Sequence, residues 1–401
     1  MRVFLSAAVL LTVTCAAPLT AQEPDSARTD TTRNPRMEGL PLRPTRSLQY
    51  TATEGSWMSV DVSPDGRTIV FDLLGDLYTV PITGGPATAL TRGMAFDMQP
   101  RFSPDGQRIV FVSDRGGGEN VIHMALNGSD TVSVTTGKTT GYQGPEWTPD
   151  GEYLVVSRAS GSVEKLWMYH RNGGSGLGLV TEPATVRLLG AAFGADPRYI
   201  WASRRTGSWT YNSPMSEYDL VVYDRETGAL TTRTSRWGGA IRPTLSPDGR
   251  WLVFGTRHVN ETGLRIRDLS NGDERWLAYP VQRDEQEARA SRDALPGMSF
   301  TPDSREVVVS YGGRIWRVPV DGGAPVAVPF EAPVDLDLGP QVDFAYDIPD
   351  SATFIARQIR DAVPSPDGRR LAFVTADPSP DVFIIENPLA DAPPRVTTVP
   401  R

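Results

Sequence analysis

Short apolar runs separated by polar turns recur along most of this chain, and the turns share one sequence. It reads Ser/Thr-Pro-Asp-Gly, with degenerate copies that retain the aspartate. The seven copies begin at the following residues: Ser63, Ser103, Thr148, Gly194, Ser246, Thr301 and Ser365. Successive copies lie 40 to 64 residues apart. A repeat of this length indicates one supersecondary unit that is used many times.

The turn sequence has a structural role that follows from its residue types. Proline presets φ for the second position of a tight turn, and glycine accepts the positive φ that strains other residues. Apolar β-formers follow the turn, as in Thr68–Phe71 and Arg108–Val112. A third run such as Asp76–Val80 comes next, then a Gly-rich turn such as Gly84-Gly85, and then a fourth run. Each repeat is therefore predicted to form four antiparallel strands joined by hairpins.

Four short antiparallel strands per repeat are typical of the blade of a β-propeller. We therefore predict an all-β fold, a β-propeller of about seven four-stranded blades, in which the strand before each turn sequence is innermost. An open solenoid is the alternative. It is disfavoured because twisted four-stranded blades tend to close around an axis.

Closure of this ring leaves one strand too many. Leu48–Thr53 precedes the first blade and would complete the last blade as its outer strand, but Arg395–Val399 competes for the same place. Either the ring closes in another way, or the native polypeptide continues past Arg401. Val342–Tyr346 is predicted to form an additional strand between the sixth and seventh repeats.

The amino-terminal residues indicate export. Arg2 precedes an apolar run at Val3–Val13, and the small residues that follow suit cleavage after Ala21. This run is too short to cross a bilayer, which takes about 20 apolar residues. A lipoprotein signal that uses Cys15 is the alternative, although Thr14 is larger than the residue usual before a lipidated cysteine.

These features divide the chain into three predicted segments. They are a signal peptide at 1–21, a disordered linker at 22–47 with few large apolar residues, and a β-propeller at 48–401. No later segment is apolar enough to be a transmembrane helix. We therefore expect a periplasmic or secreted protein.

Composition narrows the possible partners. The only cysteine lies in the predicted signal peptide, so the mature protein is expected to use neither disulfides nor thiol chemistry. The formal net charge of −8 argues against nucleic acid or anionic lipid as a partner. A chain of 401 residues is long enough to bury a large core, from which its stability must come.

The repeat, with its Ser-Pro-Asp-Gly turn and a terminal Leu-Thr such as Leu90-Thr91, resembles the TolB-type propeller repeat over residues 48 to 400. Three longer segments carry a more specific resemblance: Gly55–Gly66, Arg204–Asn212 and Tyr311–Pro319. They are similar to the propeller that precedes an amidohydrolase domain in large exported bacterial proteins. The resemblance implies a metal-dependent catalytic barrel after the propeller, opening with a His-x-His pair of metal ligands.

This chain departs from that family where the chemistry would begin. Its only histidines are His123, His170 and His258, which lie on different repeats without a His-x-His pair. A metal-dependent hydrolase needs several His and carboxylate ligands that converge on the metal. A Gly-x-Ser-x-Gly elbow between a strand and a helix is also missing. We therefore expect no catalytic residue, metal site or cofactor here, and the chain is either a truncated relative or a stand-alone propeller.

Propellers usually bind their ligands at the channel mouth, through polar residues near the start of the innermost strands. The candidate residues in that position are Asp97, Gln99, Arg101, Tyr142, Gln143, Glu146, Arg242, Arg357 and Arg360. The alternative is a water-filled channel that binds nothing specific.

The loop from Trp209 to Tyr218 is a second candidate, since Trp209 and Tyr211 lie beside the polar residues Asn212 and Glu217. Exposed aromatic side chains with polar neighbours suit contact with a protein or carbohydrate. The alternative is a loop that folds over the edge of a blade as a plug.

Two charged segments carry weaker hypotheses. Arg283–Asp293 suggests a docking face for another domain, or else a solvated surface segment. The aspartates between the sixth and seventh repeats have oxygen ligands for calcium but no known loop spacing, so a solvated connection is favoured: Asp335, Asp337, Asp343, Asp347 and Asp350. Asp114–Gly118 is predicted to be a hairpin turn and not a phosphate-binding loop, because no helix follows it.

The leading functional hypothesis is a non-catalytic propeller of the cell envelope or the secreted fraction. It would act as a protein-interaction or substrate-gating module, with a protein partner or a covalently linked hydrolase domain. One alternative is the front portion of a metal-dependent amidohydrolase whose barrel is missing from this chain. Another is a TolB-like component of an envelope complex, although the small α/β domain that precedes the propeller in TolB is not seen.

Overall fold

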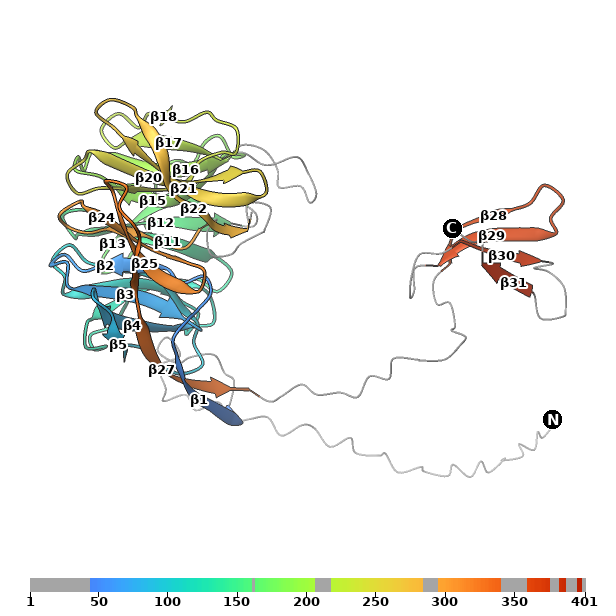
Figure 1. The fold of residues 1–401 in the computed structure, drawn as a ribbon, viewed down its shortest axis with the longest axis horizontal. Coiled ribbons are helices and arrows are strands. Elements are labelled where there is room, and N and C mark those ends of the chain that lie inside the picture. The colour runs from blue at the N-terminus through green and yellow to red at the C-terminus, as the bar shows by residue number, and fades with distance from the viewer. Residues whose placement is uncertain are drawn as a thin grey trace, which may run out of the picture. The chain divides into compact units, whose positions relative to one another are not determined.

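The computed structural model describes residues 44–160, 163–205, 218–283, 295–339, 359–375, 382–386 and 395–398. The chain divides into two compact units, Met1–Pro340 and Gln341–Arg401, which are considered separately. The described residues fold into strands and their connections, without a helix (Figure 1). The described residues therefore contain no helix that could span a membrane. The predicted signal peptide and most of the predicted linker lie outside the described residues.

The first unit contains six four-stranded antiparallel sheets, numbered here as blades 1 to 6 in chain order. Blade 1 consists of β2 (Val60–Val62), β3 (Thr68–Leu73), β4 (Asp76–Pro81) and β6 (Thr88–Ala89). Blade 2 consists of β7 (Asp97–Phe102), β8 (Arg108–Ser113), β9 (Asn120–Ala125) and β10 (Val132–Ser133). Blade 3 consists of β11 (Gly141–Trp147), β12 (Tyr153–Ser160), β13 (Val163–His170) and β14 (Leu177–Gly178).

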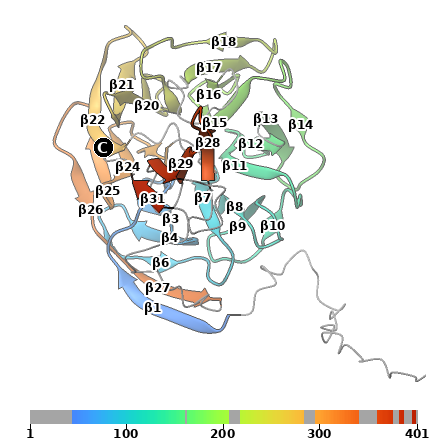
Figure 2. The ribbon, with the colours of Figure 1, turned by 90° about the vertical axis from the view of Figure 1, so that its right-hand side faces the viewer.

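The other three blades follow the same order along the chain. Blade 4 consists of β15 (Arg187–Phe193), β16 (Tyr199–Arg205), β17 (Asp219–Asp224) and β18 (Leu230–Thr232). Blade 5 consists of β19 (Ile241–Leu245), β20 (Trp251–His258), β21 (Glu261–Asp268) and β22 (Glu274–Arg283). Blade 6 consists of β23 (Ser299–Phe300), β24 (Glu306–Tyr311), β25 (Arg314–Pro319) and β26 (Val326–Val328). The first strand of each blade lies nearest the axis, as predicted (Figure 2).

The six blades close into a ring because a buried apolar cluster fills each of the six interfaces between neighbours. The second strand of each blade supplies both of its interfaces. In β3, for example, Ile69 and Phe71 belong to the cluster shared with blade 6, whereas Val70 belongs to the cluster shared with blade 2. This follows from the strand geometry, since successive side chains point to opposite faces of a sheet. All three side chains are fully buried.

The last interface, between blades 6 and 1, is also hydrogen-bonded through the backbone. The amide of Val60 donates to the carbonyl oxygen of Gly297 at 3.0 Å, and the amide of Gly297 donates to Oγ of Ser59 at 3.1 Å. The amide of Gly55 donates to the carbonyl oxygen of Gly313 at 3.0 Å. The ring of the first unit therefore closes after six repeats.

The seventh predicted sheet is present, but it belongs to the second unit. It consists of β28 (Ile359–Pro364), β29 (Arg370–Thr375), β30 (Val382–Glu386) and β31 (Arg395–Thr398). Its turn repeats the hydrogen bonds of the other blades, since Ser365 Oγ donates to Asp367 Oδ1 at 2.6 Å. The prediction of seven four-stranded sheets is thus confirmed, while closure after the sixth differs from the expected ring of all seven.

The surplus strand at the start of the propeller has a different partner from the one expected. β1 (Arg46–Ala52) pairs with β27 (Phe330–Leu338) and does not complete the last blade, because β31 already occupies that place. On its other side β27 pairs in parallel with β5 (Gly85–Pro86). This three-stranded sheet packs Val334 and Ala332 into the same cluster as blades 6 and 1. The additional strand predicted at Val342–Tyr346 lies outside the described residues.

The repeated turn is held by its own side chains. In blade 2, Ser103 Oγ donates to Asp105 Oδ1 at 2.6 Å and accepts the amide of Arg108 at 2.9 Å. The hydrogen bond from Ser103, followed by one from the amide of Gln107, lowers the pKa of Asp105. Gly106 has a φ of +67°, the left-handed conformation that glycine accepts without strain.

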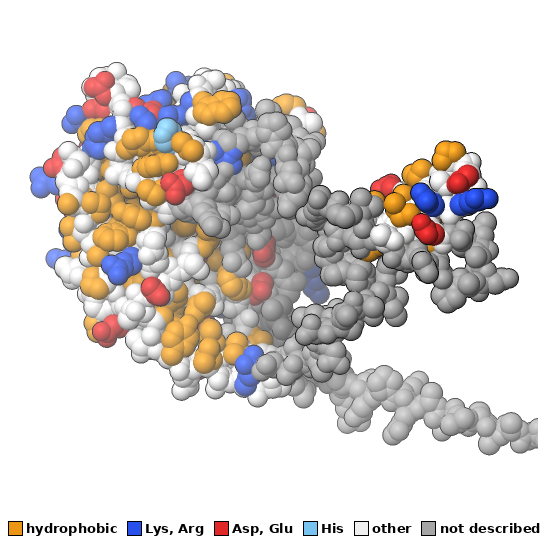
Figure 3. All heavy atoms as spheres, turned by 45° about the vertical axis from the view of Figure 1, so that its right-hand side comes forward, with side chains coloured by type: hydrophobic (Ala, Val, Ile, Leu, Met, Phe, Trp, Pro, Cys, Tyr) orange, Lys and Arg blue, Asp and Glu red, His pale blue; other side chains and the backbone are white. Residues whose placement is uncertain are grey.

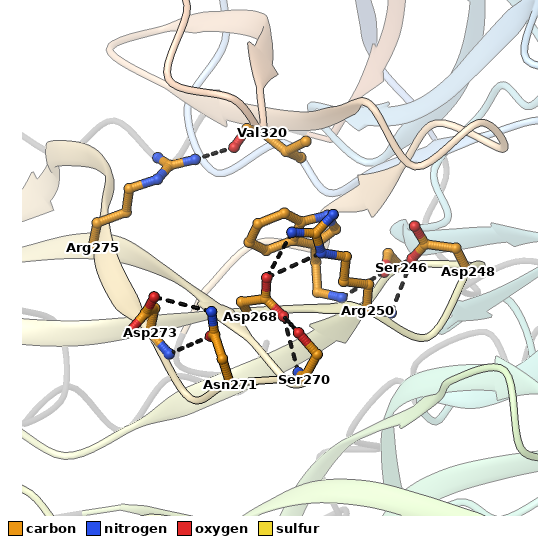
Figure 4. A network of polar contacts seen from close by, with 10 residues as sticks. Ser246, Asp248, Arg250, Asp268, Ser270, Asn271, Asp273, Arg275 and Val320 are labelled. Atoms are coloured by element: carbon orange, nitrogen blue, oxygen red, sulfur yellow. Dashed lines mark hydrogen bonds and ion pairs between the residues drawn. The ribbon is translucent and has the colours of Figure 1, made fainter.

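Blade 5 adds an ion pair to the same turn (Figure 4). Arg250 follows the turn and donates to Asp268 Oδ2 at the end of β21, from Nε at 3.0 Å and from Nη2 at 2.8 Å. Ser270 Oγ donates to the other oxygen of Asp268 at 2.6 Å. Arg275 donates a hydrogen bond to the carbonyl oxygen of Val320 and so connects blade 5 to blade 6.

Hydrophobic side chains are also exposed on the outside of the first unit, on the face drawn in Figure 3.

We predict that Ser103→Ala lowers the free energy of unfolding by about 1–3 kcal/mol, because the Arg108 amide loses its acceptor and Asp105 its donor. Ser103→Thr is the matched control, since Thr148 and Thr301 make the same contacts in blades 3 and 6. Chemical denaturation followed by circular dichroism measures both variants. Equal stability of the Ala and Thr variants would contradict a structural role for the hydroxyl.

Candidate functional site

The residues that line the channel share one place in the repeat, two positions before the turn sequence. There the six innermost strands carry Asp61, Arg101, Glu146, Ala192, Thr244 and Ser299. All six border one cavity of about 170 Å³, together with Phe193, Pro243 and Met298 among others. Blades 1 to 3 contribute the charged side chains, and blades 4 to 6 contribute the small uncharged ones. One side of the cavity is therefore ionic and the other side is uncharged.

Arg101 is the centre of the ionic wall. Its Nη1 donates to Asp61 Oδ1 at 3.2 Å and to the carbonyl oxygen of Met298 at 3.0 Å. Its Nε lies 3.4 Å from Oε2 of Glu146. The second oxygen of Asp61 accepts the amide of Phe102 at 2.8 Å. One guanidinium group, 9% exposed as a residue, thus connects blades 1, 3 and 6 across the channel.

Arg242 approaches the same place from blade 5. A Cβ atom on Gly297 would lie 3.1 Å from Nη2 of Arg242 and 3.6 Å from Nη2 of Arg101. The absence of a side chain at Gly297 therefore leaves room for both guanidinium groups. The charge of Arg242 also acts on Glu146, whose charged form it favours.

Glu146 is the titratable group of this site. Burial raises its pKa to about 7; the Arg101 charge opposes the rise, and the nearby Asp61 carboxylate adds to it. Burial outweighs the attraction because removal of a carboxylate from water is costly even beside a cation. The charge of the cavity thus changes close to neutral pH.

Four innermost strands share an irregularity next to this ring. The residue four positions before the turn sequence has a left-handed φ in blades 2 to 5: Gln99, Gly144, Gly190 and Arg242. Each lies at a register shift in the pairing of its strand. The amide at this position donates to a polar side chain: Asp72 Oδ2 accepts Gln99, Gln99 Oε1 accepts Gly144, Ser157 Oγ accepts Gly190 and Ser203 Oγ accepts Arg242. Every acceptor belongs to the preceding blade, so these bonds join neighbours at the channel.

The structure brings together three of the residues predicted for the channel mouth, namely Arg101, Glu146 and Arg242, with Gln99 at the adjacent bulge. Tyr142 and Gln143 lie elsewhere on β11. Tyr142 packs in the apolar cluster between blades 2 and 3, with its hydroxyl 3.5 Å from that of Tyr169. Gln143 is buried at the register shift of β11.

Asp97 belongs to a second ionic group, at the opposite end of β7 from Arg101. Its Oδ2 accepts Nη2 of Arg115 at 2.6 Å, and its Oδ1 is buried without a hydrogen-bond partner among the described residues. Burial, followed by repulsion from Asp97, raises the pKa of Asp76 to about 7. The two aspartates lie on neighbouring blades 1 and 2 and do not line the cavity.

The remaining candidates do not contribute to the cavity. Trp209, Tyr211 and Arg357 lie outside the described residues, as does nearly all of Arg283–Asp293. Arg360 is an exposed residue of β28 in the second unit. Asp114–Gly118 forms the hairpin turn between β8 and β9, as predicted, where the amide of Gly117 donates to the carbonyl oxygen of Asp114 at 2.8 Å.

Sequence reasoning missed Asp61, Ser59 and Gly297. Asp61 was detectable, because it occupies the same offset from its turn sequence as Arg101 and Glu146. Ser59 and Gly297 become neighbours only when blade 6 meets blade 1. The sequence analysis instead expected the ring to close between the seventh repeat and the first.

Within the described part of the chain, no group of three or more His, Cys, Asp or Glu side chains is placed to hold a metal ion.

Residues 41–184 match the family model of the TolB beta propeller domain. The match spans β1 and blades 1 to 3, which are therefore similar in sequence to this propeller domain. It is similar to the Tol-Pal system protein TolB of Wolinella succinogenes, with 31% identity over 122 residues, which are 29% of this chain and 28% of that protein. It is also similar to the uncharacterized peptidase YuxL of Bacillus subtilis, with 27% identity over 180 residues, 45% of this chain and 24% of that protein.

The crystal structure of the tricorn protease has a similar fold, with a TM-score of 0.52 and 17% identity over 87% of this chain and 31% of that one. At this identity the likeness concerns the fold alone. The chain spans about a quarter of the length of the two curated relatives that it matches.

We predict that Glu146→Gln changes the pH dependence of stability. The carboxyl titrates near 4.5 when unfolded and near 7 when folded, so its protonated form stabilises the fold fully below pH 4.5 and this contribution is lost as the pH rises through 7. Because one pKa unit corresponds to about 1.4 kcal/mol, wild type should lose up to about 3 kcal/mol more than the variant between pH 4.5 and 8.

Denaturant titrations at both pH values test this expectation. Glu331→Gln, at an exposed residue of β27, controls for the loss of one negative charge. Parallel stability curves for wild type and Glu146→Gln would show that the channel carboxyl does not titrate in this range.

Proposed function

We propose that this propeller is a non-catalytic binding and gating module of a periplasmic or secreted protein, which receives a polypeptide segment in its channel. The observation that carries the proposal is the channel cavity, which is lined by ionic side chains from blades 1 to 3 and by uncharged side chains from blades 4 to 6. In this proposal, catalysis belongs to a protein partner or to a covalently linked hydrolase domain.

The cost of the ionic wall supports a functional reading. Arg101, Asp61 and Glu146 are taken largely out of water, and buried ion pairs are often no more stabilising than apolar residues of similar volume. The apolar clusters between the blades already hold the ring together. Charges in the channel are thus better explained by a ligand that interacts with them than by stability. A polypeptide offers carboxylate, amide and basic groups, each of which Arg101 or the two carboxyls can bind.

The relatives favour a gating role beside a hydrolase. The relative YuxL is named as a peptidase, and this chain matches only 24% of its length, which leaves room in it for a separate catalytic domain. The narrower expectation of an amidohydrolase domain rests on the resemblance of the three sequence segments alone. The similarity to TolB supports the second candidate function, a component of an envelope complex.

A photo-crosslinker in the channel tests the proposal. We predict that p-benzoylphenylalanine at Ser299, which lines the cavity, forms polypeptide adducts in the exported protein, whereas the same residue at exposed Ser129 does not form them. Gly297→Leu should reduce the Ser299 adducts strongly, because its side chain would fill the space at Arg242 and Arg101. Mass spectrometry of the adducts separates a linked domain from a separate envelope protein.

Thermal unfolding of each variant shows whether the ring remains intact. Identical adducts from Ser299 and Ser129, or adducts that Gly297→Leu leaves unchanged in a folded protein, would rule out the channel as the binding site. Adducts that never contain polypeptide would overturn the gating role as well.

A further inference from the structure

Among the described residues, strand β1 forms an open edge of the first unit. It is the outermost strand of the described sheet β1–β27–β5, and pairs along its whole length with β27 on one side only. The register from Arg46 opposite Leu338 to Ala52 opposite Ala332 is unbroken. An edge strand of this kind presents a row of backbone N–H and C=O groups to any chain that can pair with it.

The other edges of the first unit are protected against such pairing. The outer strands of five blades have only two or three residues: β6, β10, β14, β18 and β26. The outer strand of blade 5, β22, is ten residues long but has two register shifts. Short and bulged edges are common devices against unwanted association. By contrast, β1 has seven residues without proline, lysine or a bulge.

One face of β1 also carries exposed apolar side chains. Leu48 is 46% exposed and Tyr50 is 44% exposed. They lie opposite Leu336 and Val334 of β27, so all four side chains share one face of the sheet. Val334 is buried in the cluster between blades 6 and 1, and Leu336 packs against it. The apolar face thus starts in the core and continues to an uncovered edge.

We propose that the occupant of this edge is β1 of a second copy of the chain, paired antiparallel about a twofold axis at Gln49. The sequence Arg-Ser-Leu-Gln-Tyr-Thr-Ala is self-complementary in that register. Leu48 lies opposite Tyr50 of the second copy on the apolar face. On the other face Ser47 lies opposite Thr51 of the second copy, and the two Gln49 side chains face each other.

Other registers lose this match. An axis at Leu48 places Tyr50 opposite Arg46, and an axis at Tyr50 places Leu48 opposite Ala52. An axis between two residues places Leu48 opposite a polar side chain, so the apolar face of one copy would continue into the polar face of the other. The register at Gln49 produces one six-stranded sheet with a continuous apolar face, which is the closed isologous contact that most homodimers use.

Cysteine crosslinking tests both the interface and its register. The only natural cysteine is Cys15, so a Cys15→Ser background makes any introduced thiol unique. Gln49→Cys should form disulfide-linked dimers under mild oxidation, because residues directly opposite in antiparallel strands lie within disulfide reach. Ser47→Cys, on the same face of the same strand, should yield about tenfold less, because its counterpart is Thr51 and not itself. Mixing Ser47→Cys with Thr51→Cys should restore the crosslink.

Light scattering after size exclusion gives the independent measurement. The full chain should be dimeric, and Leu48→Lys combined with Tyr50→Lys should be monomeric with an unchanged melting temperature, since both side chains lie outside the core. Equal crosslinking at Gln49 and Ser47 would indicate random collision and overturn the register. A monomer at all concentrations, without crosslinking at either position, would overturn the proposal.

Discussion

The structure of the first unit depends on one constraint: each of its four-stranded sheets is apolar on both faces and can bury them only against two neighbours. Ile69, Val70 and Phe71 of one strand are fully buried, yet they belong to two different clusters. Burial of side chains of this size contributes about 1.5–3 kcal/mol each, so a blade with one free face forfeits a large part of its stability. Closure of the ring removes every free face at once. The hydrogen bonds between Val60, Ser59 and Gly297 mark the place where this happens.

Closure also creates the polar centre. Six innermost strands that converge on an axis bring buried backbone groups together, and those groups need hydrogen-bond partners. The left-handed residues of blades 2 to 5 turn an amide toward the preceding blade, where Asp72, Gln99, Ser157 or Ser203 accepts it. The same geometry places the residues two positions before each turn side by side. A charge network thereby forms from residues that are far apart in the chain, Asp61, Arg101 and Glu146.

The channel and the β1 edge are two places where the burial of apolar faces between blades does not explain the side chains that are present. In the channel, ionic side chains remain largely buried where apolar ones would satisfy the ring, and they border a cavity whose other side is uncharged. At β1, an apolar face that begins in the core continues past it, with Leu48 and Tyr50 uncovered. Both features cost free energy in an isolated ring, since one buries charged groups and the other exposes apolar side chains to water. A polypeptide in the channel would pair with the charged groups, and a second copy at the edge would cover the apolar side chains.

The sequence by itself determined the local structure. Proline and glycine in the turn, with β-forming runs on either side, act through φ preferences and nearest neighbours, so the seven four-stranded sheets and their innermost strands were predictable. Arg101, Glu146 and Arg242 were also placed near the channel, because they are polar residues of the strands predicted to be innermost. The tertiary structure decided how many blades close the ring, since that depends on the packing angle between sheets and on contacts such as Ser59 with Gly297, 238 residues apart. Only the tertiary structure placed Tyr142 in the cluster between blades 2 and 3, because a register shift changes the face to which each side chain of a strand points.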